Sequence, residues 1–270
     1  MRPGAVRSIL LAAGLLPGTA PAQGPTPPAA PTGTDANRKV AALDARLTDA
    51  FRLIKAGRYE QARREARDYL TGAAGTPAHP GQGWFILGLS YHRQRLYESA
   101  RGNFAKAVAL EPDYVTAYFF YGFTLFNLGR LDEAAKAFES YLARGPEDSE
   151  AVFGLGLVAL EQDRVDDAER SFLRAIAVAQ GREVGPLLSP GLREDLSRYE
   201  ARLADVHLRR GDLPKARADL ERSVDLWPEH FEPWHKLALL LRRLGDEKGA
   251  DQAQARADEA FRRRTAPGQP

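Results

Sequence analysis

Cysteine is absent from the 270-residue chain. Its absence excludes disulfides, zinc sites built on thiolates, a cysteine nucleophile and a lipid anchor on an N-terminal cysteine. The sequence also lacks any uninterrupted run of the roughly 20 apolar residues that a membrane-spanning helix requires. We therefore expect no integral membrane span in the mature chain.

An excess of charge of one sign is also lacking. The 38 Lys and Arg residues nearly balance the 36 Asp and Glu residues, which leaves a formal net charge of +2. Such a small surplus argues against a nucleic-acid partner, because nucleic-acid binding depends on neutralising many phosphates. The 44% of hydrophobic residues and 27% of charged residues are ordinary values for a soluble globular protein.

The first 22 residues have the features of an export signal in the expected order. Arg2 and Arg7 precede the short apolar run 9–16, and Ala20-Pro21-Ala22 is a small-x-small pattern typical of signal-peptidase cleavage. These features predict a signal peptide over 1–22 and an exported protein, periplasmic or secreted. The alternative is an Ala- and Pro-rich leader on a cytosolic protein. Both surplus positive charges lie in this segment, so the remaining chain is formally neutral.

Residues 23–37 follow as a Pro- and Gly-rich segment, with Pro25, Pro27, Pro28 and Pro31 close together. Proline has no amide donor, and it disfavours helical conformation in the residue before it. The composition predicts a disordered, extended tether over 23–37.

The rest of the chain repeats itself with a period of 34 residues. One repeated column is Gly88, Gly122 and Gly156, and a second is Phe104, Phe138 and Phe172. Within each unit, apolar residues recur at steps of three and four, which is the period of a helix, in two runs separated by a turn. The small residues allow two helices to approach closely, and the large aromatics fill the space beside the next unit. Turns are predicted at four glycines that follow the first helix of a pair, Gly57, Gly129, Gly211 and Gly245.

The unit 84–112 carries the signature residues Trp84, Leu87, Gly88, Tyr91, Ala100, Phe104, Ala107 and Pro112. With these residues the chain resembles the tetratricopeptide repeat (TPR) family over about 43–264. The resemblance implies an all-α fold, a right-handed α-solenoid of about six helix-turn-helix units. The units are 43–76, 81–114, 115–148, 149–182, 197–230 and 231–264, and the first and last are atypical, as terminal units of a solenoid are.

The predicted organisation along the chain has three parts after the tether. Residues 38–180 hold units 1–4, residues 181–189 form an inserted loop, and residues 190–264 hold units 5–6 with a capping helix before a short tail, 265–270. Ser189-Pro190 is typical of an N-cap followed by proline at the first helical position. We expect the insertion to lengthen a loop and a helix, with a solenoid hinged at 181–189 as the alternative.

Sequence motifs for chemistry are lacking. There is no phosphate loop, no Gly-x-Ser-x-Gly elbow and no metalloprotease motif. His230 and His235 are close in sequence but lack the i, i+4 spacing that places two imidazoles on one helical face. We therefore predict no enzyme, no catalytic residues, no metal and no cofactor, and we keep a metal or small ligand at the His230–His235 corner as the least favoured hypothesis.

The resemblance implies that a ligand lies along the concave face formed by the first helix of each unit. Phe119, Phe123 and Phe126 form one stripe on such a helix, and half-exposed rings on the groove would leave an apolar patch of several hundred Å². The equally favoured alternative is that neighbouring helices, a homodimer or the tether cover these rings. The predicted protein-binding groove consists of Phe85, Leu89, His92, Phe119, Phe123, Phe126, Asn127, Phe153, Leu157 and Leu160, followed by Arg198, Arg209 and Arg242 in the last two units.

Some members of the family hold a partner's C-terminal carboxylate in a clamp of Lys, Asn and Arg. Phe85 and Leu89 stand where the first clamp residues would be, so this clamp is not expected. The favoured function is an exported, non-catalytic scaffold that binds a protein or peptide partner of unknown identity, in cell-envelope assembly or complex formation. The alternative is a self-associating assembly factor, a homo-oligomer whose copies fill the groove.

Overall fold

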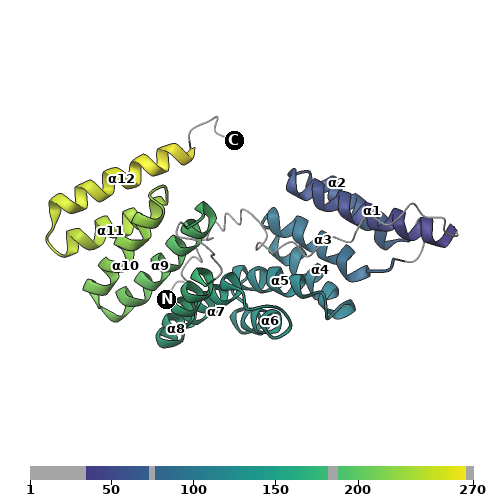
Figure 1. The fold of residues 1–270 in the computed structure, drawn as a ribbon, viewed down its shortest axis with the longest axis horizontal. Helices are drawn as coiled ribbons and strands as arrows, with labels where there is room; N and C mark the ends of the chain where they lie inside the picture. The colour runs from purple at the N-terminus through teal and green to yellow at the C-terminus, as the bar shows by residue number, and fades with distance from the viewer. Residues whose placement is uncertain (1–34, 73–76, 182–187, 266–270) are drawn as a thin grey trace. The chain divides into compact units, whose positions relative to one another are not determined.

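The computed structural model describes residues 35–72, 77–181 and 188–265, and all regular secondary structure in these ranges is α-helical. The predicted signal peptide lies outside the described residues. The twelve helices of the described ranges are α1 (Asp35–Lys55), α2 (Tyr59–Leu70), α3 (Pro80–Arg93), α4 (Tyr97–Leu110), α5 (Val115–Asn127), α6 (Leu131–Arg144), α7 (Ser149–Glu161), α8 (Val165–Gln180), α9 (Pro190–Arg210), α10 (Leu213–Leu226), α11 (Phe231–Arg243) and α12 (Glu247–Thr265) (Figure 1).

The helices form six consecutive pairs, from α1 and α2 to α11 and α12, and the two helices of each pair pack against one another (Figure 1). The all-α fold of helix-turn-helix units predicted from the sequence is thereby confirmed. Helix α1 begins at Asp35, within the segment 23–37 predicted to be a tether. Helices α4, α6 and α10 each end two residues before Pro112, Pro146 or Pro228, as expected of a residue that cannot continue a helix.

Two compact units divide the chain between Pro146 and Glu147. The first unit holds α1 to α6 and the second holds α7 to α12. Helices α8 and α9, which flank the predicted loop 181–189, pack against one another within the second unit. Helix α9 starts as its sequence predicts, because the Ser189 side chain accepts a hydrogen bond from the Leu192 N–H and Pro190 follows it.

The glycine and phenylalanine columns meet inside their pairs. A Cβ atom at Gly88 would lie 2.7 Å from the Phe104 ring, and one at Gly122 would lie 2.7 Å from the Phe138 ring. In the second unit a Cβ atom at Gly156 would lie 2.5 Å from Phe172. No side chain fits at such distances, so these glycines are required by the close approach of the two helices, as predicted.

The turn inside every pair contains a residue in the left-handed region. Four are the predicted glycines, with φ between 72° at Gly57 and 82° at Gly245. The other two pairs have Arg95 (φ 61°) and Asp163 (φ 58°) at the equivalent position. A side chain in this conformation costs about 1–2 kcal/mol, because its Cβ lies close to the following carbonyl oxygen. The repeat geometry therefore fixes the left-handed turn even where the sequence offers no glycine.

Candidate functional site

The apolar residues of the predicted groove are buried. All eight of them, from Phe85 to Leu160, are 7% exposed or less. Of the two alternatives for these phenylalanines, an exposed apolar patch is wrong and cover by neighbouring helices is what the structure has. The assignment of these residues to partner binding stays a prediction.

In the first unit, Phe119 and Phe123 of α5 are buried because other aromatic rings cover them. The Phe119 ring lies 5.0 Å from the Phe123 ring and 5.4 Å from the Tyr141 ring of α6, and Phe123 lies 4.8 Å from Phe138. On α3, the Phe85 ring makes an edge contact at 5.1 Å with Tyr114. Three of these contacts are edge-to-face and the contact of Phe119 with Tyr141 is tilted. Such arrangements are favourable between aromatic side chains, so the rings pack on one another instead of facing water.

In the second unit Phe153 is covered in the same way, by Phe172 of α8 at 5.5 Å and by Tyr199 of α9 at 4.7 Å. Tyr199 also donates a hydrogen bond of 2.5 Å to Glu150, a neighbour of Phe153 on α7. The long helix α9 thus covers a face of α7 on which the resemblance to the repeat family had placed a ligand.

The polar groove residues of the first unit are used inside the fold. His92 Nδ1 lies 2.8 Å from the Thr124 hydroxyl, and the Asn127 amide donates to the Phe123 carbonyl at 2.7 Å. Burial, helped by the neighbouring charge of Arg93, lowers the pKa of His92 to about 4. The imidazole is neutral at physiological pH, so it offers no cation to a ligand.

The arginines predicted to line the groove of the second unit are ion-paired within it. Arg198 pairs with Glu150 at 2.5 Å and also with Asp195. Arg209 donates to the Leu160 carbonyl and pairs with Asp163 at 3.2 Å. Arg242 pairs with Glu247 at 3.5 Å and Asp251 at 3.3 Å. Arg198 is thus held in a mostly buried ion pair, whereas the pairs of Arg209 and Arg242 lie at the surface. The assignment of these arginines to partner binding stays a prediction.

A pocket of about 410 Å³ does open on the first-helix face of the first unit, between α1 and α3. We call it the α1–α3 pocket. Its apolar lining is Leu47, Phe51, Phe85, Ile86 and Tyr114, and its polar lining is Thr48, Arg52, Lys55 and Gln82. Phe85 is the only one of the predicted groove residues that lines it.

Among the residues whose side chains the structure describes, one cation at this pocket has no carboxylate partner. The Lys55 ammonium lies 5.0 Å from the centre of the Phe51 ring and forms no ion pair with any described residue. Arg52, by contrast, pairs with Asp49 at 2.9 Å. The pocket thus combines an apolar floor with a cation at its edge. It can bind a segment that carries an apolar side chain and a carboxylate.

The signal for this pocket was present in the sequence but hidden. Arg46 and Asp49 replace the signature residues of the first repeat, which made that repeat look unimportant. In the same alignment, Leu47 and Phe51 fall at the positions of Phe85 and Leu89. The first repeat thus lacks the signature residues but keeps apolar residues at the groove positions, which indicates that the first-helix face continues onto α1.

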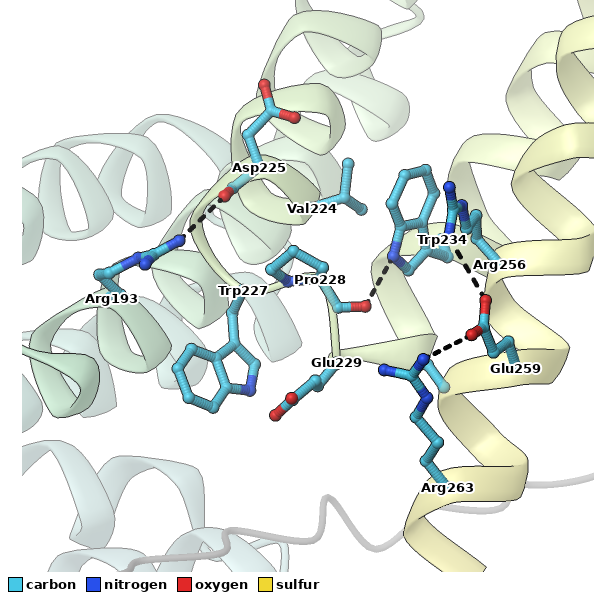
Figure 2. Close-up of a pocket in the computed structure, with 11 residues that line it drawn as sticks. Arg193, Val224, Asp225, Trp227, Pro228, Glu229, Trp234, Arg256, Glu259 and Arg263 are labelled. Atoms are coloured by element: carbon cyan, nitrogen blue, oxygen red, sulfur yellow. Dashed lines mark hydrogen bonds and ion pairs between the residues drawn. The ribbon is translucent and has the colours of Figure 1, made fainter.

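A second pocket, of about 550 Å³, lies in the second unit (Figure 2). We call it the Trp227 pocket. It is lined by Arg193 of α9, Val224 and Asp225 of α10, Trp227, Pro228 and Glu229 of the following turn, Trp234 of α11, and Arg256, Glu259, Ala260 and Arg263 of α12. No predicted groove residue belongs to it, and no motif of the sequence indicated it.

The two histidines near this pocket do not come together. His230 is largely buried, with Nδ1 3.2 Å from the Ser197 hydroxyl, and His235 is exposed beside Gln254. Burial lowers the pKa of His230 to about 4. Within the part of the chain that the structure describes, no cluster of His, Asp and Glu could hold a metal ion. No helix of that part is long and apolar enough to cross a membrane.

The repeated helix pairs, with their left-handed turns and glycine–phenylalanine contacts, define a helical-repeat protein. The sequence profile of the tetratricopeptide repeat matches residues 52–115, 87–143, 122–182 and 201–270. The chain therefore belongs to the tetratricopeptide repeat family, as its resemblance implied.

Among curated proteins, the chain is 33% identical over 137 residues to cellulose synthase operon protein C of Xanthomonas axonopodis pv. citri. It is 31% identical over 97 residues to the cell division cycle protein 27 homolog of Caenorhabditis elegans. These matches cover 50% and 36% of this chain but only 9% and 12% of the two relatives. The chain thus spans a small part of the curated relatives that it matches.

Among solved structures, the fold is similar to that of PilW, a type IV pilus biogenesis factor, with a TM-score of 0.66 and 18% identity. That match covers 84% of this chain and 96% of PilW. The PilF protein of Pseudomonas aeruginosa has a TM-score of 0.63 and 17% identity, with 86% and 95% of the two chains covered. At these identities the likeness shows a shared fold.

Proposed function

We propose that the chain is an exported, non-catalytic scaffold that binds a segment of a partner protein on the first-helix face of its repeats. The observation that carries the proposal is the α1–α3 pocket, which joins an apolar floor to the unpaired ammonium of Lys55. Since that cation has no carboxylate in the described chain, we infer that the partner supplies one, next to an apolar side chain. The fold shared with a pilus biogenesis factor supports a role in assembling a cell-envelope complex.

Site-specific crosslinking tests the binding proposal. A photoreactive residue replaces Gln82 at the pocket, and a matched one replaces Leu110, which is 53% exposed and does not line the pocket. We expect a discrete crosslinked partner from position 82 and none from position 110. The product should disappear when Lys55→Glu is added, because the carboxylate of the partner would then face a like charge. Equal crosslinking from both positions, or indifference to Lys55→Glu, would contradict the proposal.

Export is tested separately, by the mass of the protein recovered from cells. Cleavage after Ala22 predicts a chain that begins at Gln23 and is found outside the cytoplasm. An uncleaved chain in the cytoplasm would remove export from the proposal while leaving the binding pocket intact.

A further inference from the structure

The Trp227 pocket of the second unit is preformed and carries a hydrogen-bond donor that the fold does not use. Figure 2 shows Trp227 and Trp234 on either side of Pro228. The Trp227 backbone N–H donates to the Ser223 carbonyl at 3.1 Å, and the Trp227 carbonyl accepts from the His230 N–H at 3.0 Å. The Trp234 indole donates to the Pro228 carbonyl at 2.9 Å. The Trp227 indole N–H, by contrast, has no hydrogen-bond partner among the described residues, so it is available to a ligand.

A carboxylate of the same turn is also unused. Glu229 follows Trp227 by two residues, lines the pocket and is exposed. Its side chain forms no hydrogen bond or ion pair with any residue that the structure describes. Glu259, on the α12 side of the pocket, instead pairs with Arg263 at 2.6 Å and with Arg256 at 3.4 Å. The unpaired charge on the turn therefore favours an occupant that presents a cation to Glu229.

The arginines of the lining are held by the fold and keep donors to spare. Arg193 donates to the Leu226 carbonyl at 3.0 Å, and Arg256 and Arg263 share Glu259. A guanidinium has five N–H donors, and these contacts use only some of them. With the Trp227 indole, the spare N–H groups favour an occupant that is rich in carbonyl acceptors.

An extended proline-rich segment with one basic residue meets these requirements. Proline offers a ring and a carbonyl but no N–H that would need an acceptor. Such segments adopt the polyproline II conformation and dock in aromatic-lined grooves. An acidic segment would face Glu229 with a like charge. An apolar helix would cover the Trp227 indole N–H without offering it an acceptor, which is unfavourable.

We propose that the Trp227 pocket binds a proline-rich segment of a partner protein. The proline rings lie against Trp227 and Trp234, a segment carbonyl accepts from the Trp227 indole, and a basic side chain of the segment pairs with Glu229. The pocket volume of about 550 Å³ lies within the roughly 300–1,000 Å³ of typical ligand pockets. This site lies entirely in the second unit and is independent of the α1–α3 pocket in the first. Each unit then recognises a segment of different chemistry.

The first test titrates the synthetic peptide acetyl-PPAPPAR-amide into the full chain and follows the indole N–H signals of its three tryptophans by NMR. Two prolines and the arginine of this peptide lie on one face of a polyproline II helix, which has three residues per turn. We expect the Trp227 signal to shift in a saturable manner and the Trp84 signal to stay in place. The same peptide with every proline changed to alanine should bind about tenfold more weakly, as expected when central anchors are removed.

Substitutions of the tryptophan locate the site. Trp227→Ala should weaken binding of the peptide about tenfold. Trp227→Phe keeps an apolar ring but loses the N–H, and it should weaken binding about threefold, the size of one hydrogen bond. Trp84→Phe in the other unit is the matched control and should leave the affinity unchanged. Circular dichroism confirms that each variant keeps its helix content, and the Phe variant serves if the Ala variant loses it.

A second pair of substitutions tests the charge. Glu229→Gln should weaken binding of the arginine peptide about threefold, the size of a surface ion pair, and should not affect a peptide with alanine in place of the arginine. Glu221→Gln is the control, because Glu221 belongs to the same unit but does not line the pocket. Lys55→Glu should leave binding of the arginine peptide unchanged, so failure of this site is distinguishable from failure of the α1–α3 pocket.

Three outcomes would overturn the proposal. One is a Trp227 signal that does not respond to the peptide at millimolar concentration. A second is equal binding of the proline-free peptide. The third is tighter binding of a peptide in which glutamate replaces the arginine, because that result would assign the pocket to an acidic segment.

Discussion

In the first unit a connected set of aromatic rings packs between neighbouring helix pairs, whereas the second unit combines ring contacts and an aliphatic core with several buried charged groups. Phe85, Phe104 and Phe120 contact one another in the first unit. In the second, His207 bridges Asp219 of α10, at 2.5 Å, and Glu169 of α8, at 3.2 Å. Both units have the same helix pairs and turns. The repeat signature therefore fixes the helix pairing, and the residues between the signature positions decide how neighbouring pairs are held together.

This difference predicts that the two units are destabilised by different kinds of substitution. Ring packing is lost when a ring is removed, and the loss depends little on salt or pH. A buried ionic network fails when one member is removed, because the remaining charges are left without partners in a poorly solvated place. The following substitutions test this difference, from the largest expected effect to the smallest.

Phe104→Ala should have the largest effect. Phe104 is fully buried and contacts Phe85 and Phe120, and its ring fills the space above Gly88. Removing such a ring costs about 3–5 kcal/mol of unfolding free energy. Hydrogen exchange measured by mass spectrometry should show the loss in α3 to α5. Phe261→Ala is the control, since Phe261 is 50% exposed, and it should cost far less; equal losses would contradict the ring-packing account.

Asp219→Ala should destabilise the second unit by about 2–4 kcal/mol, because Asp219 is 2% exposed and holds both His207 and Arg222. Faster hydrogen exchange is expected in α8 to α10. Glu221→Ala breaks an ion pair between half-exposed residues, Glu221 and Arg217, and should change stability by no more than about 0.5 kcal/mol. If both substitutions cost the same, the buried network does not hold the second unit together.

Acid should weaken both units, because each contains a histidine whose pKa is lowered by burial, His92 in the first unit and His230 in the second. The pKa of His92 and that of His230 are each lowered to about 4, below the ordinary 6.5, and burial is the main cause. Above pH 6.5 the imidazole is neutral in both the folded and the unfolded states. Between pH 6.5 and about 4 each of these histidines is protonated in the unfolded state but still neutral in the folded state. Acidification through this range therefore lowers the free energy of unfolding.

For His92 this loss is on the order of 2 kcal/mol. Urea denaturation of the His92→Gln variant between pH 7 and 4.5 checks it. We expect the variant to be less stable than the natural chain at pH 7 but to lose less stability on acidification. A variant with an unchanged pH dependence would show that His92 is not the group that responds.

Arg95→Gly should stabilise the first unit by about 0.5–1 kcal/mol. Arg95 has a φ of 61°, which strains its side chain, and glycine relieves that strain at some cost in chain entropy. Gly129→Ala, at the equivalent turn of the next pair, should destabilise by a similar amount. Thermal unfolding of the two variants should therefore shift in opposite directions.

The fold was predictable because its rules are local and repeated. Gly88 and Phe104 lie sixteen residues apart and recur with the same spacing, so the close approach of two helices at the glycines was predictable from the repeat. That the phenylalanine of the same pair covers the glycine was not predicted, since the rings were expected beside the next unit. The site was less predictable. Whether Phe119 faces water depends on Tyr141, a ring at the position where the unit 84–112 has the small signature residue Ala107. The partner of Arg198 is Glu150, 48 residues earlier. A position on the concave face could be inferred from the sequence, but its exposure depends on side chains from neighbouring repeats.

The turn positions have one practical consequence. All six are exposed, and all six accept a left-handed residue. Arg95 in the first unit and Asp163 in the second already carry side chains there, so a single cysteine at either place adds no new backbone strain. Because the natural chain has no cysteine, such a thiol would be unique. Two variants, each with one label, would let the unfolding of the first unit and that of the second be timed separately.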